Sequence, residues 1–276
     1  MPSSDPASSV MRLRVSRIGK PGSPEDHVVG EEPLEIRVQT GDSEPAQLGI
    51  TMRTPGADIE LAAGFLWSEG LLRERDDLIS ITTCKDKELS PREQENTVVA
   101  HVRPGAPALD RTLQRRFTMS SACGVCGSSQ IDDLHARGCR TVPASSLSDE
   151  QLASLTEQLR PQQRIFDRTG GLHAAGLFDA SGNLVVLRED VGRHNAVDKV
   201  IGHALMHELL PLHGYALAIS GRGGFEIIQK AVAAQISAVV AVSAPTSLAV
   251  ETAREFGLTL LGFARDGSAT KYSPAP

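Results

Sequence analysis

Two cysteines three positions apart are the residues of this chain whose type and spacing point most directly to chemistry. Cys123 and Cys126 lie in the run SSACGVCG, from Ser120 to Gly127. Thiolates attack sulfur and bind metals, so such a pair can close a disulfide, hold a metal ion or pass on a sulfur atom. Glycine adopts backbone angles that other residues resist, and the neighbouring glycines therefore favour a loop. We expect both thiols to lie on an accessible loop.

Four chemistries compete for this pair. A structural zinc site needs four ligands, and His135 and Cys139 would complete a set with Cys123 and Cys126. A zinc deaminase needs a His-x-Glu motif before a Pro-Cys-x-x-Cys motif, and the sequence after His173 lacks that glutamate. A thioredoxin-like motif would follow the first strand of a small domain, whereas this pair lies mid-chain. In sulfur transfer, one thiol carries the sulfur atom as a persulfide and the other assists its delivery or relays it.

Composition limits the class of protein. The chain has 276 residues, of which 40% are hydrophobic and 22% charged, enough for one large or two modest domains. A net charge of -6 and the lack of a long basic run argue against a nucleic-acid polymer as partner. No apolar run approaches the roughly 20 residues that span a bilayer, and the first residues do not resemble a signal peptide. We therefore expect a cytoplasmic protein without a membrane partner.

The first half of the chain is typical of a small α+β unit. Apolar residues at helical spacing predict a helix over 58–69, and Leu48, Ile50 and Met52 alternate as in a strand. Further strands are expected at 11–18, 34–38, 78–82 and 97–102, and short helices at 110–117 and 131–137. We expect a disordered tail over 1–10 and a domain over 11–140 that ends in the Cys-x-x-Cys loop.

The second half has a different pattern. Ser148 and Gln151 form a capping-box pattern, which predicts a helix that ends near Pro161. A hairpin is expected at 173–178 and 184–187. Helices are expected from about 195, at 225–236 and at 246–256. A short apolar run follows each of them, at 215–219, 238–242 and 258–263. Such alternation implies strands that are parallel and buried on both faces. We expect a layered α/β domain over 141–276 with helices on both faces of its sheet.

The loops that follow these strands indicate a second site. In open parallel sheets, ligands bind beyond the carboxyl ends of the strands. The four loops carry Arg193, Arg222 and Arg265 together with glycines and hydroxyl residues, and arginines and helix N-termini bind phosphate. The pattern predicts a pocket for a phosphorylated or nucleotide-bearing ligand, with Asp190 and Asp266 assigned to a base edge or sugar hydroxyl. For His173 and His194, a structural and a chemical role both stay open.

Several motifs together resemble one family, the FdhD sulfurtransferases required for formate dehydrogenase activity. The resemblance runs from about residue 28 to the C-terminus. The matching segments are SACGVCG (121–127), TGGLHAA (169–175), EDVGRHNAVDK (189–199), SGRGGFE (220–226), SAPTS (243–247) and GFAR (262–265).

The resemblance implies a role for particular residues. It identifies Cys123 as the persulfide-bearing cysteine, Cys126 as its partner, and 263–268 as the segment that binds the cofactor. The expected cofactor-binding residues are Phe263, Ala264, Arg265, Asp266, Gly267 and Ser268, to which the pocket prediction adds Gly221 and Arg222.

The resemblance also implies a fold, a cofactor and partners. Its members have a cytidine-deaminase-like sheet with a separate smaller domain and form homodimers. They accept sulfur from a cysteine desulfurase and pass it to the molybdenum bis-molybdopterin guanine dinucleotide cofactor (Mo-bis-MGD), which then enters formate dehydrogenase. A guanine nucleotide such as GDP is the expected mimic of this ligand. The alternative is a structural-zinc, nucleotide-binding module without sulfur transfer.

Overall fold

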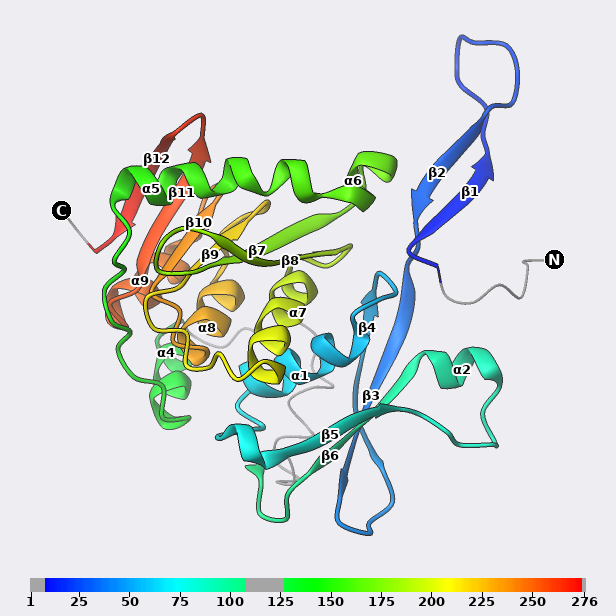
Figure 1. Ribbon diagram of the computed structural model, residues 1–276, viewed down its shortest axis with the longest axis horizontal. Coiled ribbons are helices and arrows are strands. Elements are labelled where there is room, and N and C mark those ends of the chain that lie inside the picture. Colours follow the sequence, from blue (N-terminus) through cyan, green and yellow to red (C-terminus); the bar gives the residue numbers. More distant parts are fainter. Residues whose placement is uncertain (1–7, 108–126, 275–276) are drawn as a thin grey trace.

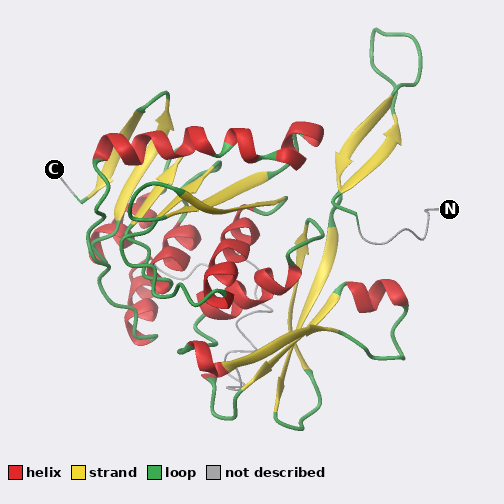
Figure 2. Ribbon diagram, viewed as in Figure 1, coloured by secondary structure: helices red, strands yellow, loops and turns green. Residues whose placement is uncertain are grey.

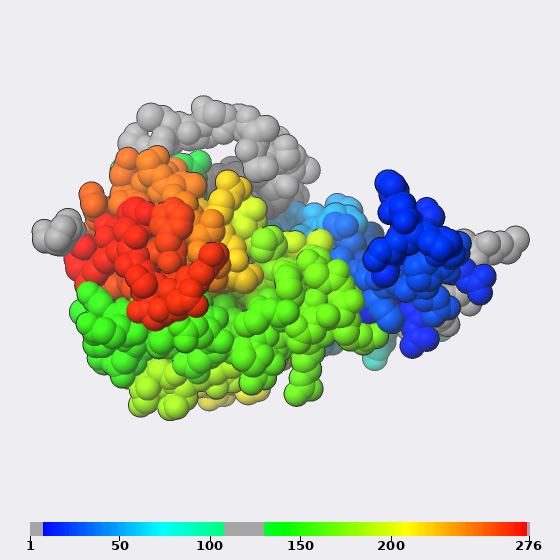
Figure 3. Space-filling model, turned by 90° about the horizontal axis from the view of Figure 1, so that it is seen from above, coloured from blue at the N-terminus to red at the C-terminus, as the bar shows by residue number. Residues whose placement is uncertain are grey.

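The computed structural model describes residues 8–107 and 127–274, which form three sheets and the helices packed on them (Figures 1 and 2). The first sheet is a hairpin of β1 (Val10–Arg14) and β2 (Glu25–Val29), which projects from the body of the molecule (Figure 3). The second has the order β4-β3-β6-β5, and the third the order β12-β11-β10-β9-β7-β8.

The four-stranded sheet packs on a single long helix. Its strands are β3 (Glu32–Thr40), β4 (Ala46–Arg53), β5 (Leu78–Thr83) and β6 (Thr97–Val102). The helix is α1 (Asp58–Ser68), whereas the short helix α2 (Pro91–Glu95) and the 3-10 turn η1 (Arg75–Asp77) lie in connections. Leu34 and Ile36 of the sheet share one buried cluster with Leu61 and Leu66 of the helix.

A β-bulge decides which side chains of β4 enter this core. The expected strand forms, but Leu48 is the extra residue between the pairs Ile36–Gly49 and Arg37–Gln47. Leu48 is buried, whereas Ile50 and Met52, on the opposite face, are 61% and 48% exposed. A bulge moves the side chains beyond it to the opposite face of the sheet, and the period of two in the sequence does not reveal this change.

Helix α1 joins the two parts of the chain by an unusually close contact with α7 (Arg193–Met206). A Cβ atom on Gly64 would lie 1.8 Å from the carbonyl oxygen of Asp198, and one on Gly202 would lie 1.8 Å from that of Glu60. Glycine is therefore required at both positions for the helices to approach this closely. The Trp67 indole also donates a hydrogen bond of 3.0 Å to the carbonyl oxygen of Ala233.

The six-stranded sheet forms the centre of the C-terminal half. Its strands are β7 (His173–Phe178), β8 (Leu184–Asp190), β9 (Ala216–Ile219), β10 (Ala238–Ala241), β11 (Thr259–Arg265) and β12 (Ser268–Ser273). Strands β9, β10 and β11 are parallel, and β7 and β12 run against their neighbours. Strand β8 is antiparallel to β7 and so points the same way as β9–β11.

Helices cover both faces of this sheet (Figure 1). One face packs on α7, α8 (Phe225–Ala233) and α9 (Ser247–Glu255). The other face packs on a continuous helical segment, α5 (Asp149–Ser154), η3 (Leu155–Gln158), η4 (Arg160–Gln162) and α6 (Arg164–Thr169). Along β9, Leu217 belongs to the first core and Ala216 and Ala218 to the second, as expected for a strand buried on both faces.

The predicted α/β class with helices on both faces is confirmed, whereas several single elements differ from the sequence expectation. The helix predicted after Ser148 has the expected capping box but changes to 3-10 turns at Leu155. Strands β2 and β12 and helices α2 and α6 were not expected from the sequence, and the strand expected at 11–18 ends at Arg14. Helix α4 (Gly127–Ala136) lies close to the helix expected at 131–137, and its Leu134 belongs to the core under the six-stranded sheet. The domain limits given above stay a prediction. Within the described ranges, no helix has the length and apolar character needed to cross a membrane.

Candidate functional site

The carboxyl ends of β8, β9, β10 and β11 lie along one edge of the sheet, as the sequence predicts. This follows from the parallel pairing of β9–β11 and the orientation of β8. Strand β7 runs the opposite way, so its first residue, His173, reaches the same edge and pairs with Asp190. The loops after four strands, and the segment before a fifth, therefore meet there.

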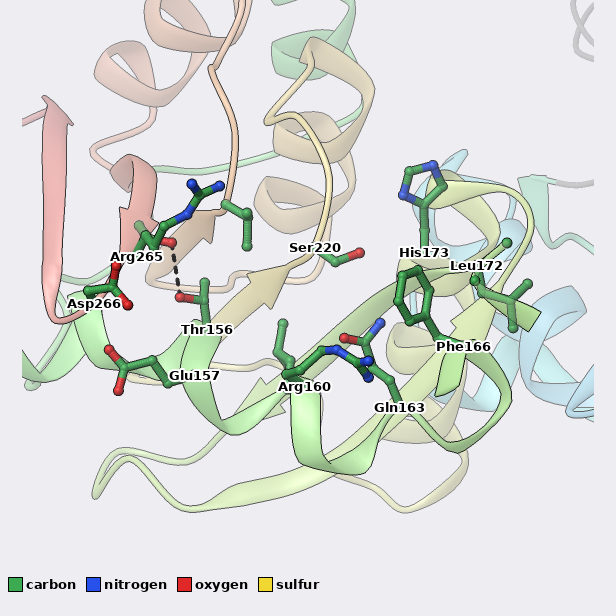
Figure 4. Close-up of a pocket in the computed structure, with 15 residues that line it drawn as sticks. Thr156, Glu157, Arg160, Gln163, Phe166, Leu172, His173, Ser220, Arg265 and Asp266 are labelled. Carbon is green, nitrogen blue, oxygen red and sulfur yellow. Dashed lines mark hydrogen bonds between the residues drawn. The ribbon is translucent and has the colours of Figure 1, made fainter. Parts of the chain in front are cut away.

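A cavity of about 780 Å³ opens at this edge, on the face covered by the α5–α6 segment (Figure 4). Its volume lies in the range of small-molecule and cofactor sites. His173, Ser220, Ala264, Arg265 and Asp266 line it from the sheet side. Space-filling Figure 3 shows the two walls side by side, the C-terminal hairpin in red and the α5–α6 segment in green.

The opposite wall comes from residues that the sequence did not single out. Thr156, Glu157, Arg160, Gln163 and Phe166 line the cavity from η3, η4 and α6. The spacing of three between 160, 163 and 166 is the one available signal, because residues three apart share a face in 3-10 and α-helical turns. Pro161 instead predicts the end of a helix, which masks this spacing.

Only part of the segment expected to bind the cofactor lines the cavity. Ala264, Arg265 and Asp266 line the cavity, whereas Phe263, Gly267 and Ser268 are not among its lining residues. The lining also lacks the other two predicted cofactor-binding residues, Gly221 and Arg222, and it lacks Arg193. The residues that the structure brings together with Arg265 are those of the helical wall.

Backbone geometry explains how 263–268 is presented. Asp266 and Gly267 have φ values of 52° and 71°, which suit a tight hairpin turn between β11 and β12. Phe263 has a φ of 55°, an outlier for a bulky residue, at an irregularity between Gly262 and Arg265. The residue is 53% exposed. Strain of this kind often marks functional segments.

Two hydrogen bonds fasten the helical wall to this hairpin. The Thr156 hydroxyl donates to the carbonyl oxygen of Ala264 at 3.2 Å. The backbone N–H of Gly267 donates to Glu157 Oε1 at 2.6 Å. The carboxylate of Glu157 is thereby engaged, and the two walls hold a fixed separation.

The charged groups at the cavity differ in how they are paired. Arg160 forms an ion pair with Asp167 and stacks over the Phe166 ring, with the guanidinium carbon 4.9 Å from the ring centre. Within the described residues, the Arg265 side chain forms no hydrogen bond or ion pair. A guanidinium without an internal partner beside a cavity is suited to a phosphate or carboxylate group.

The Gln163 side chain at the cavity also lacks an internal partner. The residue is only 4% exposed, and its side-chain amide forms no hydrogen bond within the described residues. The amide is therefore available to hydrogen-bond a group inside the cavity.

The two histidines at the edge have different environments. Burial, with smaller contributions from the positive charges of Arg193 and His194, lowers the pKa of His173 below its usual value of 6.5. His194 Nε2 lies 2.6 Å from Glu226 Oε2, and this contact lowers the pKa of Glu226. His173 is therefore a neutral imidazole at the cavity wall at pH 7.

Gly221 lies beside His173 at this edge of the sheet. A Cβ atom there would lie 3.4 Å from His173 Nδ1, and 3.9 Å from Cβ of Arg193. Both are ordinary van der Waals distances, so the loop after β9 lies against the imidazole without requiring a glycine here, and ligand contact by Gly221 stays a prediction.

The hypothesis that Asp190 contacts a ligand is wrong, because its side chain is fully buried. Lys199 Nζ lies 2.7 Å from Asp190 Oδ2, and the backbone N–H groups of Thr54 and Gly192 also donate to this carboxylate. Asn195 Nδ2 donates to Asp190 Oδ1 at 3.1 Å and to the carbonyl oxygen of Met52 at 2.7 Å. The motif at 189–199 thus fixes the end of β4 against the start of α7.

Cys123 and Cys126, and the helix expected at 110–117, lie outside the described residues. Helix α4 begins at Gly127, the residue after Cys126. The other members of the zinc set have protein contacts: His135 Nε2 lies 3.0 Å from Glu255 Oε1, and burial raises the pKa of the Cys139 thiol. Among the described residues, no group of three or more metal-ligating side chains occurs.

Comparison with known proteins gives one family. A model of the FdhD/NarQ family matches residues 29–276. The sulfur carrier protein FdhD of Streptomyces avermitilis is 49% identical over 267 residues, covering 95% of this chain and 93% of the relative. The protein of that name from Sulfurisphaera tokodaii is 42% identical over 249 residues and 90% of each chain.

A similar fold occurs in a crystal structure from Desulfotalea psychrophila, described as that of a formate dehydrogenase accessory protein. It superposes with a TM-score of 0.71 over 98% of each chain, at 22% sequence identity. At this identity the likeness concerns the fold alone.

Proposed function

Because this chain belongs to the FdhD/NarQ family, we propose that it is a sulfurtransferase that carries sulfur on Cys123 to a nucleotide-bearing molybdenum cofactor. The family match and the relatives named sulfur carrier proteins support the sulfur chemistry. The observation that carries the acceptor side is the cavity at the sheet edge, where Arg265 has no internal partner.

In the first step, the Cys123 thiolate attacks the terminal sulfur of a cysteine desulfurase persulfide. The bond between the two donor sulfurs breaks, the donor cysteine leaves as a thiolate, and Cys123 becomes a persulfide. No electrons enter or leave the system, because this step is a thiol–disulfide-type exchange. The reaction needs a reduced Cys123, which the cytoplasm maintains, and we place the protein there.

In the second step, Cys126 assists delivery. Its thiolate attacks the inner sulfur of the Cys123 persulfide, forms the Cys123–Cys126 disulfide and releases the outer sulfur as sulfide. The two electrons that reduce this sulfur come from the thiol pair, so the disulfide must be reduced before the next cycle.

The acceptor is Mo-bis-MGD, which we treat as the substrate. A cavity of about 780 Å³ can take one guanine nucleotide part of this molecule, and GDP would mimic it. Arg265 is suited to the diphosphate, since a guanidinium binds phosphate with two hydrogen bonds. Ala264 and Asp266 line the cavity beside it, and Phe263, Gly267 and Ser268 complete the hairpin that presents these residues.

The proposal includes partners. A cysteine desulfurase supplies the sulfur, and formate dehydrogenase receives the finished cofactor. A homodimer would present two nucleotide cavities, and the acceptor carries two guanine nucleotides. This match supports a dimeric carrier, which sedimentation analysis tests.

The sulfur step is tested by intact-mass analysis after incubation with a cysteine desulfurase and cysteine. We expect the native chain and Cys139→Ala to gain one sulfur atom, and Cys123→Ala to gain none. Cys139 is the matched control because it is a half-buried thiol outside the Cys-x-x-Cys motif. An undiminished adduct on Cys123→Ala would overturn the assignment. The zinc alternative instead predicts stoichiometric zinc in the purified native protein and its loss from Cys123→Ala.

A further inference from the structure

The two ends of the cavity differ in chemical character (Figure 4). Arg265 and Asp266 lie at one end, and Phe166, Leu172 and His173 lie at the other. A nucleotide has the same division, with charged phosphates at one end and a flat heterocycle at the other. The aromatic end is suited to the heterocycle, because Phe166 and Leu172 offer apolar surface and the Arg160 cation at this end is already paired with Asp167.

Gln163 lies next to Phe166 at this aromatic end (Figure 4). Its backbone is fixed, since its N–H donates to the carbonyl oxygen of Arg160 and its own carbonyl accepts from Asp167. Its side-chain amide, in a residue 4% exposed, has no partner among the described residues. The amide therefore offers one acceptor and two donor hydrogens at a set position on the cavity wall.

This pattern fits a base better than a phosphate. A phosphate only accepts hydrogen bonds and would leave the amide oxygen unpaired. The edge of a purine offers a donor beside an acceptor, so it can satisfy both sides of the amide at once.

We propose that Gln163 hydrogen-bonds the heterocyclic base of a bound nucleotide and that Phe166 provides the apolar wall against which the base packs. This inference rests on the proposed function, in which the cavity takes a nucleotide part of the acceptor. Arg160 is a positioning residue here, because its stacking over Phe166 and its ion pair with Asp167 hold the ring in place.

The test compares Gln163→Leu with Gln162→Leu in the full-length chain by calorimetric titration with GDP. Gln162 is the matched control because it is exposed and does not line this cavity. We expect Gln163→Leu to weaken GDP binding roughly tenfold, about 1.4 kcal/mol, and Gln162→Leu to leave it unchanged. Equal affinities in both variants and the native chain would overturn the inference.

A second variant separates base recognition from charge effects. Gln163→Glu places an acceptor-only carboxylate at this position, which pairs with the N1–H and amino group of guanine but faces a ring-nitrogen acceptor in adenine. Repulsion of the phosphates affects GDP and ADP equally, so the ratio of their affinities should shift toward GDP. An unchanged ratio would contradict base contact.

Stability gives a third readout. If the Gln163 amide is reserved for a ligand, Gln163→Leu should leave Tm unchanged or raise it, since the variant removes a polar group that has no protein partner. A lower Tm would indicate a structural role and contradict the inference. Failure of the native chain to bind GDP would overturn the cavity assignment as well, whereas a GDP-binding chain with an insensitive Gln163 would overturn this inference alone.

Discussion

Replacing Lys199 by methionine would break a buried ion pair that joins the two halves of the fold. The Lys199 ammonium, 2% exposed, lies 2.7 Å from the Asp190 carboxylate and donates to the carbonyl oxygens of Thr54 and Glu189 at 3.0 and 3.4 Å. Methionine has a similar length but no donor. The variant therefore leaves Asp190, which is 0% exposed, as a buried charge without its cation.

The expected loss follows from what remains around the carboxylate. Removing one partner of a buried pair costs about 3–5 kcal/mol. Three hydrogen bonds still reach Asp190, from Thr54, Gly192 and Asn195, and they partly stabilise the charge. We therefore expect the free energy of unfolding to fall by about 3 kcal/mol, the lower end of that range.

Urea unfolding followed by tryptophan fluorescence measures this loss. Trp67 is the one tryptophan of the chain, and it lies in α1 at the contact between the two halves. The double variant Asp190→Asn with Lys199→Met removes both charges and should recover part of the loss, because no unpaired charge remains. A loss below about 1 kcal/mol for Lys199→Met, or purely additive losses in the double variant, would refute the reasoning.

Three further outcomes follow from the contacts described above. Gly202→Ala should lower the free energy of unfolding by about 1–3 kcal/mol, because the added methyl group meets the Glu60 carbonyl. Gly49→Ala is the control because the space around Gly49 is open, and a similar loss of stability in that variant would contradict the prediction. Arg265→Ala should weaken GDP binding by about 1.5–3 kcal/mol in calorimetry, as for a lost charged hydrogen bond, and an unchanged titration would remove this residue from the site. The lowered pKa of His173 means that folding favours its neutral form, so the stability of the native chain should fall as the pH drops below 6.5. The Tm of His173→Gln should fall less over the same pH range. Identical profiles of Tm against pH in the two proteins would disprove this prediction.

The sequence predicted the arrangement of the sheet because its apolar runs and helices alternate. Leu217 and Val239 lie in strands buried on both faces, which gives the continuous hydrophobic pattern typical of parallel strands. Once those strands are parallel, the gathering of their following loops is a geometric consequence. That is why Arg265 could be placed at the cavity edge from the sequence.

The helical wall could not be predicted in the same way. Gln163 and Phe166 belong to short turns around Pro161, which lack the length needed for a periodic signal. Strand β12 was missed because it is polar and lies at the sheet edge, where neither face needs an apolar pattern. The cavity forms between the unpredicted helical wall and the predicted sheet edge, so its outline needed the structure.

The central claim is that sulfur moves through Cys123 to the molybdenum cofactor, and a labelled-sulfur chase tests it most directly. The chain is loaded with radioactive sulfur by a cysteine desulfurase, freed of the donor, and mixed with Mo-bis-MGD and a thiol reductant. The account predicts that label leaves the native protein and appears on the cofactor, and that Cys123→Ala transfers none. Label that stays on the loaded protein, or equal transfer by Cys123→Ala, would contradict it.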